Sequence, residues 1–491
     1  MKKTYYITTT LPYVNAEPHL GFALEIVQAD VLARYKKLQG DEVFFNTGTD
    51  EHGQKIYQAA RDEGVPTQKF CDRYAARFAL LKTALNLSYN SFIRTTSKDH
   101  LKAAQEFWRR CLANGDIYKK NYKIKYCVGC ELEKTDSELT AGRCPLHPNF
   151  DLELREEENY FFRWSNYQQQ LLQWYEQHPS FVVPPKRFNE IKKFVAAGLQ
   201  DFSISRLKDK MPWGVPVPGD DQQVMYVWFD ALVNYISAIG WPASAPSTPL
   251  GASAGRHGKF HNWWPGVQVA GKDNLRQQSA MWPAMLLSAG LKPPKQILIH
   301  GFISNQGQKM SKSLGNIADP IKLVREFGTD AVRHYLLKYI HPFEDSDFSM
   351  ESFKEVYNAD LANGLGNLIS RTTHLIEQNF NGKISIKKID LGAAVSHLIS
   401  EYKFNEAMKK IDELMTQADQ LLEREKPWQM VKTNKIMAAE VLGKVAAQLV
   451  FIAEQLQPLL PETSAKIKKI FCARKIKKPK KPLFPRIEDN I

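Results

Sequence analysis

The sequence predicts an α/β protein with a doubly wound parallel sheet, a metal-binding insertion in the sheet-forming region and an all-helical region after it. Three observations predict this fold. A strand, a long helix and a second strand follow one another in the first fifty residues. Strand-like runs return after residue 221, and nearly every segment beyond about residue 351 has a helical pattern. Alternating strands and helices favour parallel strands joined by right-handed crossovers.

The first strand, helix and strand have clear boundaries. Strands are expected at Tyr5 to Thr10 and at Glu42 to Phe45. Between them, apolar residues recur at intervals of three and four and predict one long helix: Leu20, Leu24, Val27, Val31, Tyr35 and Leu38. Pro18 suits the first turn of this helix, and Gly40 suits its carboxyl-terminal cap.

The chain changes character from Asn114 to Asp221, where short, charged and irregular pieces predict an insertion. The sheet is then expected to resume with the strands Val224 to Phe229, Val267 to Ala270 and Gln296 to His300. Ligands of open parallel sheets bind outside the carboxyl ends of the strands, so we expect the active site there. Farther along, apolar residues at helical spacing predict a helix bundle: Met408, Ile411, Met415, Ala418 and Leu422.

The composition is that of an ordinary globular protein, with 43% hydrophobic and 24% charged residues. We expect a cytoplasmic protein without a membrane segment, because no run approaches ~18 uninterrupted apolar residues and the first residues lack a signal peptide. Lys and Arg outnumber Asp and Glu by 66 to 53, and the net charge of +13 favours polyanions such as nucleic acids. Part of that excess lies in the acid-free run Lys466 to Lys481, which also suits a solvated tail.

Half of the six cysteines lie close together and are followed by a histidine: Cys127, Cys130, Cys144 and His147. A C-x₂-C pair and a C-x₂-H pair can bring four ligands to one Zn²⁺ ion in a closed tetrahedron. In a cytoplasmic chain such clustering favours a metal over disulfides. A closed site leaves no open position for a substrate, so we expect one structural zinc that organises the insertion.

Two further motifs suit a nucleotide. Pro18-His19-Leu20-Gly21-Phe22 lies where the first strand passes into the first helix. The helix start offers unpaired N–H groups, Gly21 allows close approach to the backbone, and His19 can donate to a phosphate oxygen. Lys309-Met310-Ser311-Lys312-Ser313 can surround a triphosphate with two lysines and two hydroxyls. The alternatives are a capping or packing role for His19 and an exposed basic turn at the lysines.

Together these motifs resemble the signatures of class I aminoacyl-tRNA synthetases, His-Ile-Gly-His and Lys-Met-Ser-Lys-Ser, which flank two halves of a Rossmann-type domain. Lys309 to Ser313 matches the second signature in full. His19, Leu20 and Gly21 match the first, but Phe22 stands in place of its closing His. The first half of the domain, the insertion and the second half are therefore expected in this order along the chain.

Within that class the sequence is similar to the methionine enzymes over nearly its whole length. The similarity is carried by Leu11-Pro12-Tyr13, Thr49-Asp50-Glu51-His52-Gly53, Val227-Trp228-Phe229-Asp230-Ala231, Gly271-Lys272-Asp273 and Trp282-Pro283-Ala284-Met285-Leu286. It implies a ligase that activates L-methionine with ATP and Mg²⁺, giving methionyl-adenylate and pyrophosphate, and then transfers methionine to the 3′ end of tRNA(Met). Gln278 stands where many members have His, and His147 where relatives commonly have a fourth zinc-binding Cys.

The resemblance implies a role for each candidate residue. The catalytic residues are His19, Lys309 and Lys312. The residues implied to bind ATP are His19, Gly21, Phe22, Lys309, Ser311 and Lys312. The residues implied to bind methionine are Leu11, Tyr13, Asp50, Trp228, Ala231, Tyr235, Gln278 and Trp282. The anticodon would be read by Asn367, Arg371 and Trp428.

The chemistry of these residues agrees with the implied roles. Aromatic edges and close apolar contacts suit an unbranched thioether, and the carboxylate of Asp50 suits an α-ammonium group. An amide, a guanidinium and an indole can bind and stack unpaired bases. Ordinary structural explanations stay open: the aromatic residues could belong to the core, Asp50 could cap a helix, and Asn367, Arg371 and Trp428 could have no binding role.

The predicted division of the chain has six parts. They are 1–115 and 222–320 for the two halves of the catalytic domain, 116–221 for the insertion, 321–360 for a linking stem-contact region, 361–465 for the anticodon-binding bundle and 466–491 for a basic tail. A monomer is expected, because the familiar dimerising or tRNA-binding extension of some family members is missing.

Two other functions stay open on the sequence. The first is a class I ligase for leucine, isoleucine, valine or cysteine. The insertion is too short for the hydrolytic editing domain of the branched-chain enzymes, and a cysteine enzyme would carry metal ligands in its catalytic pocket. The second is a non-catalytic tRNA-binding or nucleotide-sensing relative, against which the joint presence of His19, Asp50, Lys309 and Lys312 argues.

Overall fold

The structure is a computed structural model that describes residues 3–130, 132–134, 139–242, 260–309, 318–389 and 394–488. The chain forms two compact units. The first contains Met1–Glu17, Val43–Ala79 and Tyr89–Ile299, and the second contains Pro18–Glu42, Leu80–Ser88 and His300–Ile491. Each unit is therefore built from segments that are distant in sequence. The finer six-part division stays a prediction.

A six-stranded sheet forms the centre of the first unit, in the order β3-β2-β1-β12-β13-β7. Its strands are β1 (Thr4–Thr9), β2 (Glu42–Thr49), β3 (Ser91–Arg94), β7 (Val182–Val183), β12 (Val267–Gly271) and β13 (Gln296–His300). β1 pairs in parallel with β12, β2 with β3 and β13 with β7. The predicted parallel sheet is confirmed, and the segments 5–10, 42–45, 267–270 and 296–300 all contribute strands to it.

The strand expected at Val224 to Phe229 is a wrong prediction. β11 (Asp220–Met225) pairs antiparallel with β9 (Ser205–Leu207) and β10 (Pro216–Val217) in a separate sheet. The rest of the apolar run begins helix α7 (Val227–Ala231). Periodicity alone does not separate a short buried strand from a short buried helix, which explains the error.

The insertion has its own antiparallel sheet, in the order β5-β4-β6-β8. Its strands are β4 (Ile117–Cys127), β5 (Leu132–Lys134), β6 (Glu153–Phe162) and β8 (Phe202–Ser203). β4 and β6 pair antiparallel from Ile117 opposite Phe162 to Tyr126 opposite Glu153. The cysteine cluster therefore lies at the far end of a long hairpin.

Helices and aromatic side chains cover the central sheet of the first unit. The helices are α2 (Gln54–Asp62), α3 (Thr67–Ala84), α4 (Lys98–Ala113), α5 (Gln168–Gln177), α6 (Pro185–Ala196), α7, α8 (Asn234–Ser237), α9 (Phe260–Trp263) and α10 (Trp282–Ser288). Phe107 of α4 packs on Phe229 and Trp282, with ring centroids 5.8 and 5.5 Å apart. The buried core thus extends to residues that the sequence predicts to bind methionine.

The second unit begins with α1 (Leu20–Leu38), as the apolar spacing predicts. A small sheet in the order β15-β14-β16 follows farther along the chain, with β14 (Ile303–Asn305), β15 (Gln308–Lys309) and β16 (Ser346–Phe348). Its helices are α11 (Pro320–Phe327), α12 (Thr329–Lys338), α13 (Met350–Val356), the π-helix η6 (Tyr357–Gly366), α14 (Asn367–Phe380), α15 (Ala394–Ser400), α16 (Phe404–Glu425), α17 (Pro427–Met430), α18 (Lys435–Leu456) and α19 (Pro461–Phe471).

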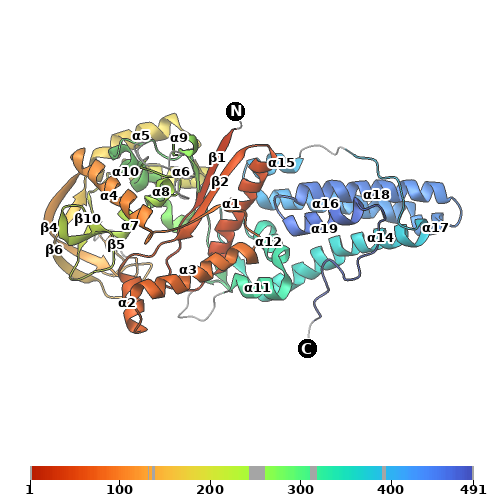
Figure 1. The fold of residues 1–491 in the computed structure, drawn as a ribbon, viewed down its shortest axis with the longest axis horizontal. Coiled ribbons are helices and arrows are strands. Elements are labelled where there is room, and N and C mark those ends of the chain that lie inside the picture. Colours follow the sequence, from red (N-terminus) through yellow and green to blue (C-terminus); the bar gives the residue numbers. More distant parts are fainter. Residues whose placement is uncertain are drawn as a thin grey trace, which may run out of the picture. The chain divides into compact units, whose positions relative to one another are not determined.

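The predicted helix bundle is confirmed, with α14, α16, α18 and α19 packed together (Figure 1). Met408, Ile411, Ala418 and Leu422 lie on the buried face of α16. α18 is the one described helix that is long and apolar enough to cross a membrane, yet 61% of its most apolar window is buried inside the protein. Such burial is typical of the central helix of a bundle.

A buried arginine joins three parts of the second unit. The Arg333 side chain on α12 has no exposed surface and lies 2.8 Å from the carboxylate of Asp30 on α1. Its Nε donates to the Leu459 carbonyl oxygen at 2.8 Å, and its Nη2 to the Pro458 oxygen at 3.2 Å. Arg34 also donates to Asp30, at 2.7 Å. The guanidinium therefore ties the middle of α1 to the end of the bundle.

Candidate active site and metal centre

His19 is the N-cap of α1, so the capping role that the sequence left open is realised. Its Nδ1 accepts a hydrogen bond from the Gly21 amide at 3.1 Å. A Cβ atom at Gly21 would lie 2.9 Å from the His19 ring, so the bend of the imidazole over the helix start requires glycine. Because Nδ1 is an acceptor, the neutral ring carries its proton on Nε2.

The start of α1 suits an anion. The first turn carries no acidic residue, so nothing on it opposes the partial positive charge of the helix start. Phe22 stands in place of the signature's second His. Its side chain is buried, so at the start of α1 only its backbone could contact a ligand. The amide of Leu20 donates to the carbonyl oxygen of Ala318 at 3.2 Å.

The lysine-rich motif lies mainly outside the described residues. Met310, Ser311, Lys312 and Ser313 all fall there, and of Lys309 the backbone is described as the end of β15. β14 and β15 form a hairpin in which Ser304 pairs with Lys309, and the Gly307 amide donates to Asp347 at 2.9 Å. The described chain resumes at residue 318, where Asp319 caps α11. The loop is thus anchored on both sides within the second unit.

Asp50 lies at the carboxyl end of β2, where the sequence places the α-ammonium ligand. It is buried, its amide donates to the Pro12 carbonyl at 3.0 Å, and its own carbonyl accepts from Val14 at 3.3 Å. These bonds hold the loop with Leu11 and Tyr13, both half-buried, beside Asp50. The N-cap of α2 is Gly53, so Asp50 does not cap that helix.

Sequence reasoning missed a buried network beside Asp50. His52 Nδ1 lies 2.6 Å from one carboxylate oxygen of Asp230, and His100 Nε2 lies 2.7 Å from the other. His100 also bonds to Ser237, at 3.0 Å. Burial by itself raises the pKa of Asp230, but the two histidines lower it to about 2. The network joins the segment after Asp50 to α4 and α7.

A second part of this network holds Glu51. Its buried carboxylate receives two hydrogen bonds from Arg94, at 2.6 and 2.8 Å, and one from Thr49 at 2.6 Å. The Trp213 indole donates to the Glu51 carbonyl at 2.6 Å. Both side-chain and main-chain atoms of Glu51 are therefore fixed, which positions the neighbouring Asp50. Arg94 and Trp213 lie far from Glu51 in the sequence, so no spacing pattern could have indicated them.

The remaining residues expected at the methionine site come from three neighbouring segments. Trp228 and Ala231 lie on α7, Tyr235 on α8, and Gln278 precedes Trp282 at the start of α10. Gln278 Nε2 donates to the Tyr235 hydroxyl at 2.7 Å, and the rings of Tyr235 and Trp282 are 6.0 Å apart. Tyr235 and Trp282 also belong to the buried core, so the structural alternative holds for them as well.

Three polar atoms in this group are buried without a hydrogen-bond partner among the described residues. They are Trp228 Nε1, Gln278 Oε1 and Trp282 Nε1. Unsatisfied buried polar atoms are uncommon, because each costs roughly 1–3 kcal/mol. A ligand that offered both an acceptor and a donor could relieve part of this cost.

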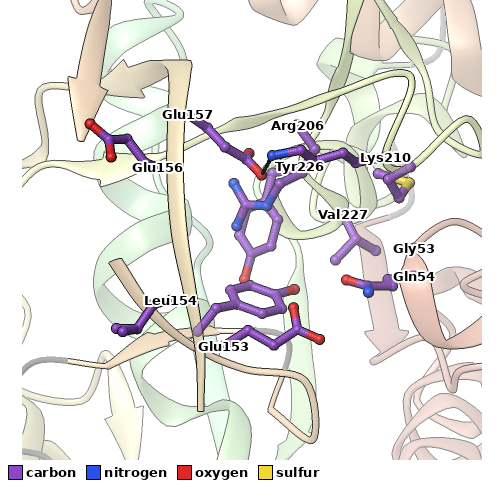
Figure 2. A pocket seen from close by; sticks show the side chains of 12 residues that line it. Gly53, Gln54, Glu153, Leu154, Glu156, Glu157, Arg206, Lys210, Tyr226 and Val227 are labelled. Carbon is purple, nitrogen blue, oxygen red and sulfur yellow. Dashed lines mark hydrogen bonds and ion pairs between the residues drawn. The ribbon is translucent and has the colours of Figure 1, made fainter. Parts of the chain in front are cut away.

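A cavity of about 320 Å³ opens beside Gly53, three residues beyond Asp50. Figure 2 shows the side chains that line it from the insertion, from β9 and from the segment that leads into α7. The guanidinium of Arg206 lies over the rings of Tyr126 and Tyr226, and Glu157 pairs with Lys210 at 3.0 Å. None of the residues expected to bind methionine lines this cavity. It is a separate space next to the strand end.

The cysteine cluster has the geometry of a zinc site. Each of Cys127, Cys130, Cys144 and His147 offers one ligand atom, and these atoms all lie within 4.8 Å of one another. Sulfur atoms bound to one tetrahedral zinc at ~2.3 Å would lie about 3.8 Å apart, close to the 3.4 Å between Cys130 and Cys144. A Cβ atom at Gly129 would lie 2.4 Å from the His147 ring, so the turn requires glycine.

The turn that carries Cys127 and Cys130 is attached to the segment that holds Asp50. Lys55 on α2 donates through its ammonium group to the Gly129 carbonyl. Lys55 lies two residues after Gly53, at the start of α2. The cysteine cluster is therefore connected to the edge of the candidate active site.

The three residues expected to read the anticodon lie in the helix bundle. Asn367 is exposed at the start of α14, Arg371 follows one turn later, and Trp428 is half-buried on α17. The Arg371 guanidinium lies 5.6 Å from the centre of the Trp428 ring. It also pairs with Asp419 at 3.2 Å and Glu423 at 2.5 Å. Arg371 and Trp428 thus form one ordered surface.

Comparison with known proteins extends over nearly the whole chain. A family model described as class I tRNA synthetases (M) matches residues 5–151 and 148–373. The methionine–tRNA ligase of Thermosynechococcus vestitus is 44% identical over 487 residues, which cover 95% of this chain and 90% of that protein. The ligase of Thermotoga maritima is 41% identical over 94% of this chain and 74% of its own length.

Solved structures give the same result. The Mycobacterium tuberculosis methionyl-tRNA synthetase in complex with methionyl-adenylate has a TM-score of 0.88 and 35% sequence identity. The match covers 99% of this chain and 100% of that one. The free state of the M. tuberculosis enzyme has a TM-score of 0.81 at 32% identity, with 99% of both chains covered. Both compact units, including the bundle, fall within these matches.

Proposed function

The chain belongs to the methionine–tRNA ligases of the class I tRNA synthetases, and on that premise we propose which of its residues perform the reaction. The reaction joins L-methionine to ATP, which gives methionyl-adenylate and pyrophosphate, and then transfers methionine to the 3′ end of tRNA(Met) for translation. The observation that carries the proposal is the hydrogen bond between Leu20 and Ala318. It brings the helix start at His19 together with the segment that leaves the lysine-rich loop.

ATP is bound by the start of α1 and by the loop Lys309 to Ser313. Six residues from Lys312 to Ala318 span at most about 20 Å, so the Lys312 ammonium can reach phosphates held over the helix start. His19 donates from Nε2 to a phosphate oxygen, and the partial positive charge at the start of α1 attracts the phosphate. Ser311 supplies a further hydroxyl from the loop.

Activation is an in-line attack of the methionine carboxylate on the α-phosphate of ATP. The P–O bond to pyrophosphate breaks as the new P–O bond forms, and the negative charge moves onto the leaving group. His19, Lys309 and Lys312 stabilise that charge, and Mg²⁺ bound to the phosphates supplies further neutralisation. No protein side chain forms a covalent bond, so the contribution of these residues is positioning and electrostatic.

Methionine lies between the strand end at Asp50 and the aromatic group of α7, α8 and α10. The Asp50 carboxylate binds the α-ammonium group. The thioether contacts Leu11, Tyr13, Trp228, Ala231, Tyr235, Gln278 and Trp282. The unpartnered buried atoms of Trp228, Gln278 and Trp282 support this assignment, because a polar ligand atom would satisfy one of them.

The cluster of three cysteines and His147 holds one structural Zn²⁺. The donor set and the closed arrangement fit a tetrahedral ion without an open position. Bound zinc supplies folding free energy to the turn that Lys55 attaches to α2. The residues of the turn keep the edge of the active site in place and take no part in the bond changes.

The partner of the bundle is tRNA(Met), which Asn367, Arg371 and Trp428 bind at the anticodon. Stacked Arg371 and Trp428 offer a flat surface to an unpaired base, and the exposed amide of Asn367 offers hydrogen bonds. We further propose that the protein is a monomer, that it lies in the cytoplasm and that it does not enter a membrane. The burial of α18 within the bundle supports the last of these points.

Amino-acid-dependent pyrophosphate exchange tests the proposal. L-Methionine should support exchange of labelled pyrophosphate into ATP, and leucine, isoleucine, valine and cysteine should not. A faster exchange with leucine or cysteine would overturn the choice of amino acid. The absence of exchange with every amino acid, from a protein that still binds tRNA, would indicate a non-catalytic relative.

A further inference from the structure

The C-terminal segment 472–488, here called the strap, is docked on the second unit rather than solvated. It leaves α19 after Phe471 and turns back along α14. The Ile476 amide donates to the Gly382 carbonyl at 2.9 Å, and the Lys478 amide donates to the Glu377 carboxylate at 2.9 Å. Figure 1 shows the strap in the darkest blue, running beside α14 to the end marked C.

The other end of the strap is held at η6. Ile487 and Asn358 exchange two hydrogen bonds, both 2.9 Å long, between the strap backbone and the Asn358 amide. Phe484 is buried, and its ring lies 6.1 Å from that of Tyr357. The strap is therefore anchored near both of its ends.

Between the two anchors, the strap and the helical run beside it have the same length. At roughly 3.3 Å per residue, the chain from Ile476 to Ile487 spans about 36 Å. At about 1.5 Å per residue, the helical run from Asn358 to Gly382 also spans about 36 Å. The strap thus lies extended and antiparallel to η6 and α14. A Cβ atom at Gly382 would lie 2.5 Å from the Ile476 carbonyl oxygen, so this close approach requires glycine.

The strap presents a row of positive charge. Among its described residues, the acid is Glu488. Its cations are all exposed: Arg474, Lys475, Lys477, Lys478, Lys480, Lys481 and Arg486. Within the described part of the chain, none of these cations forms an ion pair. Three prolines, Pro479, Pro482 and Pro485, favour the extended backbone that keeps the row straight. Seven like charges repel one another, so the row favours a polyanion along its length.

The strap follows the same helix, α14, that carries two of the residues proposed to read the anticodon. At about 100° per residue, Asn367 is roughly 80° around α14 from Glu377, which the strap contacts. Arg371 is about 120° around from the same residue. Because α14 with its side chains is only about 10–12 Å across, an RNA stem and loop that covers this arc can contact Asn367, Arg371 and the strap together.

We propose that the strap is a second RNA-binding surface, which contacts phosphates of the anticodon stem and loop while Asn367, Arg371 and Trp428 contact the bases. The proposal rests on the proposed function, since it takes tRNA as the partner. The anchors at Ile476, Phe484 and Ile487 hold the lysines in place before RNA binds. The strap therefore adds sequence-independent affinity and no base selectivity.

The test removes charge and keeps the anchors. A quadruple variant carries Lys477→Gln, Lys478→Gln, Lys480→Gln and Lys481→Gln. Its matched control loses the same charge at exposed lysines elsewhere: Lys37→Gln, Lys69→Gln, Lys98→Gln and Lys102→Gln. Binding of tRNA(Met) transcript is measured from 50 to 300 mM salt, together with methionine-dependent pyrophosphate exchange without tRNA.

The strap variant should bind tRNA at least tenfold more weakly at low salt. The slope of log affinity against log salt should fall by about 3, because four phosphate contacts are lost and each contributes ~0.7–0.9. The control should keep both values, and a Lys→Arg version of the strap variant should restore them. If the Lys→Gln variant binds tRNA with the affinity and the salt slope of the wild-type protein, the proposal is overturned. Exchange should stay at the wild-type rate, whereas failure of the ligase function would abolish exchange in the unmodified protein.

Discussion

The Leu20 amide donates a hydrogen bond of 3.2 Å to the carbonyl oxygen of Ala318. These two residues lie at opposite ends of the sequence that builds the active site, yet both belong to the second unit. The bond sets the first turn of α1 against the returning end of the lysine-rich loop. We expect phosphates bound above that turn to be within reach of both His19 and the lysine-rich motif, which ends five residues before Ala318.

Replacing Lys312 with alanine should slow adenylate formation by about 10²–10³-fold, the usual cost of removing one donor to developing charge. Methionine affinity should stay unchanged, because the ammonium acts on the leaving pyrophosphate. Single-turnover kinetics and equilibrium binding of methionine measure the two quantities. Lys322→Ala, at an exposed lysine on α11, should leave both intact. An equal loss of rate and methionine affinity would contradict the assignment.

Replacing Asp50 with asparagine should raise the KM for methionine by about 10–100-fold, since a charge-assisted hydrogen bond contributes roughly 1.5–3 kcal/mol. The KM for ATP should change little. Pyrophosphate exchange at varied methionine and ATP concentrations separates the two constants. Asp62→Asn, at an exposed carboxylate on α2, is the matched control. A rise in the KM for ATP alone would contradict the placement of Asp50 at the methionine site.

Removal of zinc should lower the thermal unfolding temperature by several degrees, because the insertion depends on the ion for part of its folding free energy. The purified protein should contain one zinc per chain. Cys144→Ser should lose the metal, His147→Cys should keep it, and Cys472→Ser, at an exposed cysteine outside the cluster, should have no effect. Elemental analysis with calorimetry gives both readouts. Full zinc content in Cys144→Ser would refute the four-ligand site.

His334 should make the protein less stable in mild acid. Burial on α12 is the largest influence on its pKa and lowers it to about 3, although Asp360 opposes the shift. The unfolded chain, with a pKa of ~6.5, gains a proton in mild acid that the folded protein does not bind. Stability should therefore fall by about 1.4 kcal/mol per pH unit as pH drops from ~6 toward 4.

Urea unfolding of His334→Gln and the parent at pH 7, 6 and 5 checks this dependence. In the variant, the free energy of unfolding should no longer fall by about 1.4 kcal/mol per pH unit between these pH values. His397→Gln, at a side chain that is 71% exposed, should keep it. The same slope in His334→Gln and the parent would show that His334 is not the group responsible.

The sequence predicted those parts of the protein whose pattern is local. Apolar spacing identified α1, and the strands around it followed from its position. The spacing of Cys127, Cys130 and Cys144 predicted a cluster that could hold a metal, and the structure brings these side chains together with His147. The first signature motif lies at a helix start, as its pattern predicts, and of the second motif the structure describes the backbone of Lys309 at the end of β15.

The features that escaped prediction depend on contacts between distant segments. β7 has only two residues, and its pairing with β13 leaves no periodic pattern. The contacts of His52 and His100 with Asp230 join three elements that no spacing rule connects. The lysine-rich tail has the composition of a solvated segment, and its docking depends on three scattered apolar residues and on Gly382. Tertiary packing decided each case.

The Arg333 side chain makes the ligase difficult to shorten. The guanidinium is satisfied jointly by Asp30 on the helix that begins at His19 and by the carbonyl oxygens of Pro458 and Leu459. A chain cut before those carbonyls would leave buried donors without acceptors, each at a cost of about 1–3 kcal/mol. A fragment that lacks Pro458 and Leu459 should therefore hold α1 less firmly, unless other groups supply the missing acceptors.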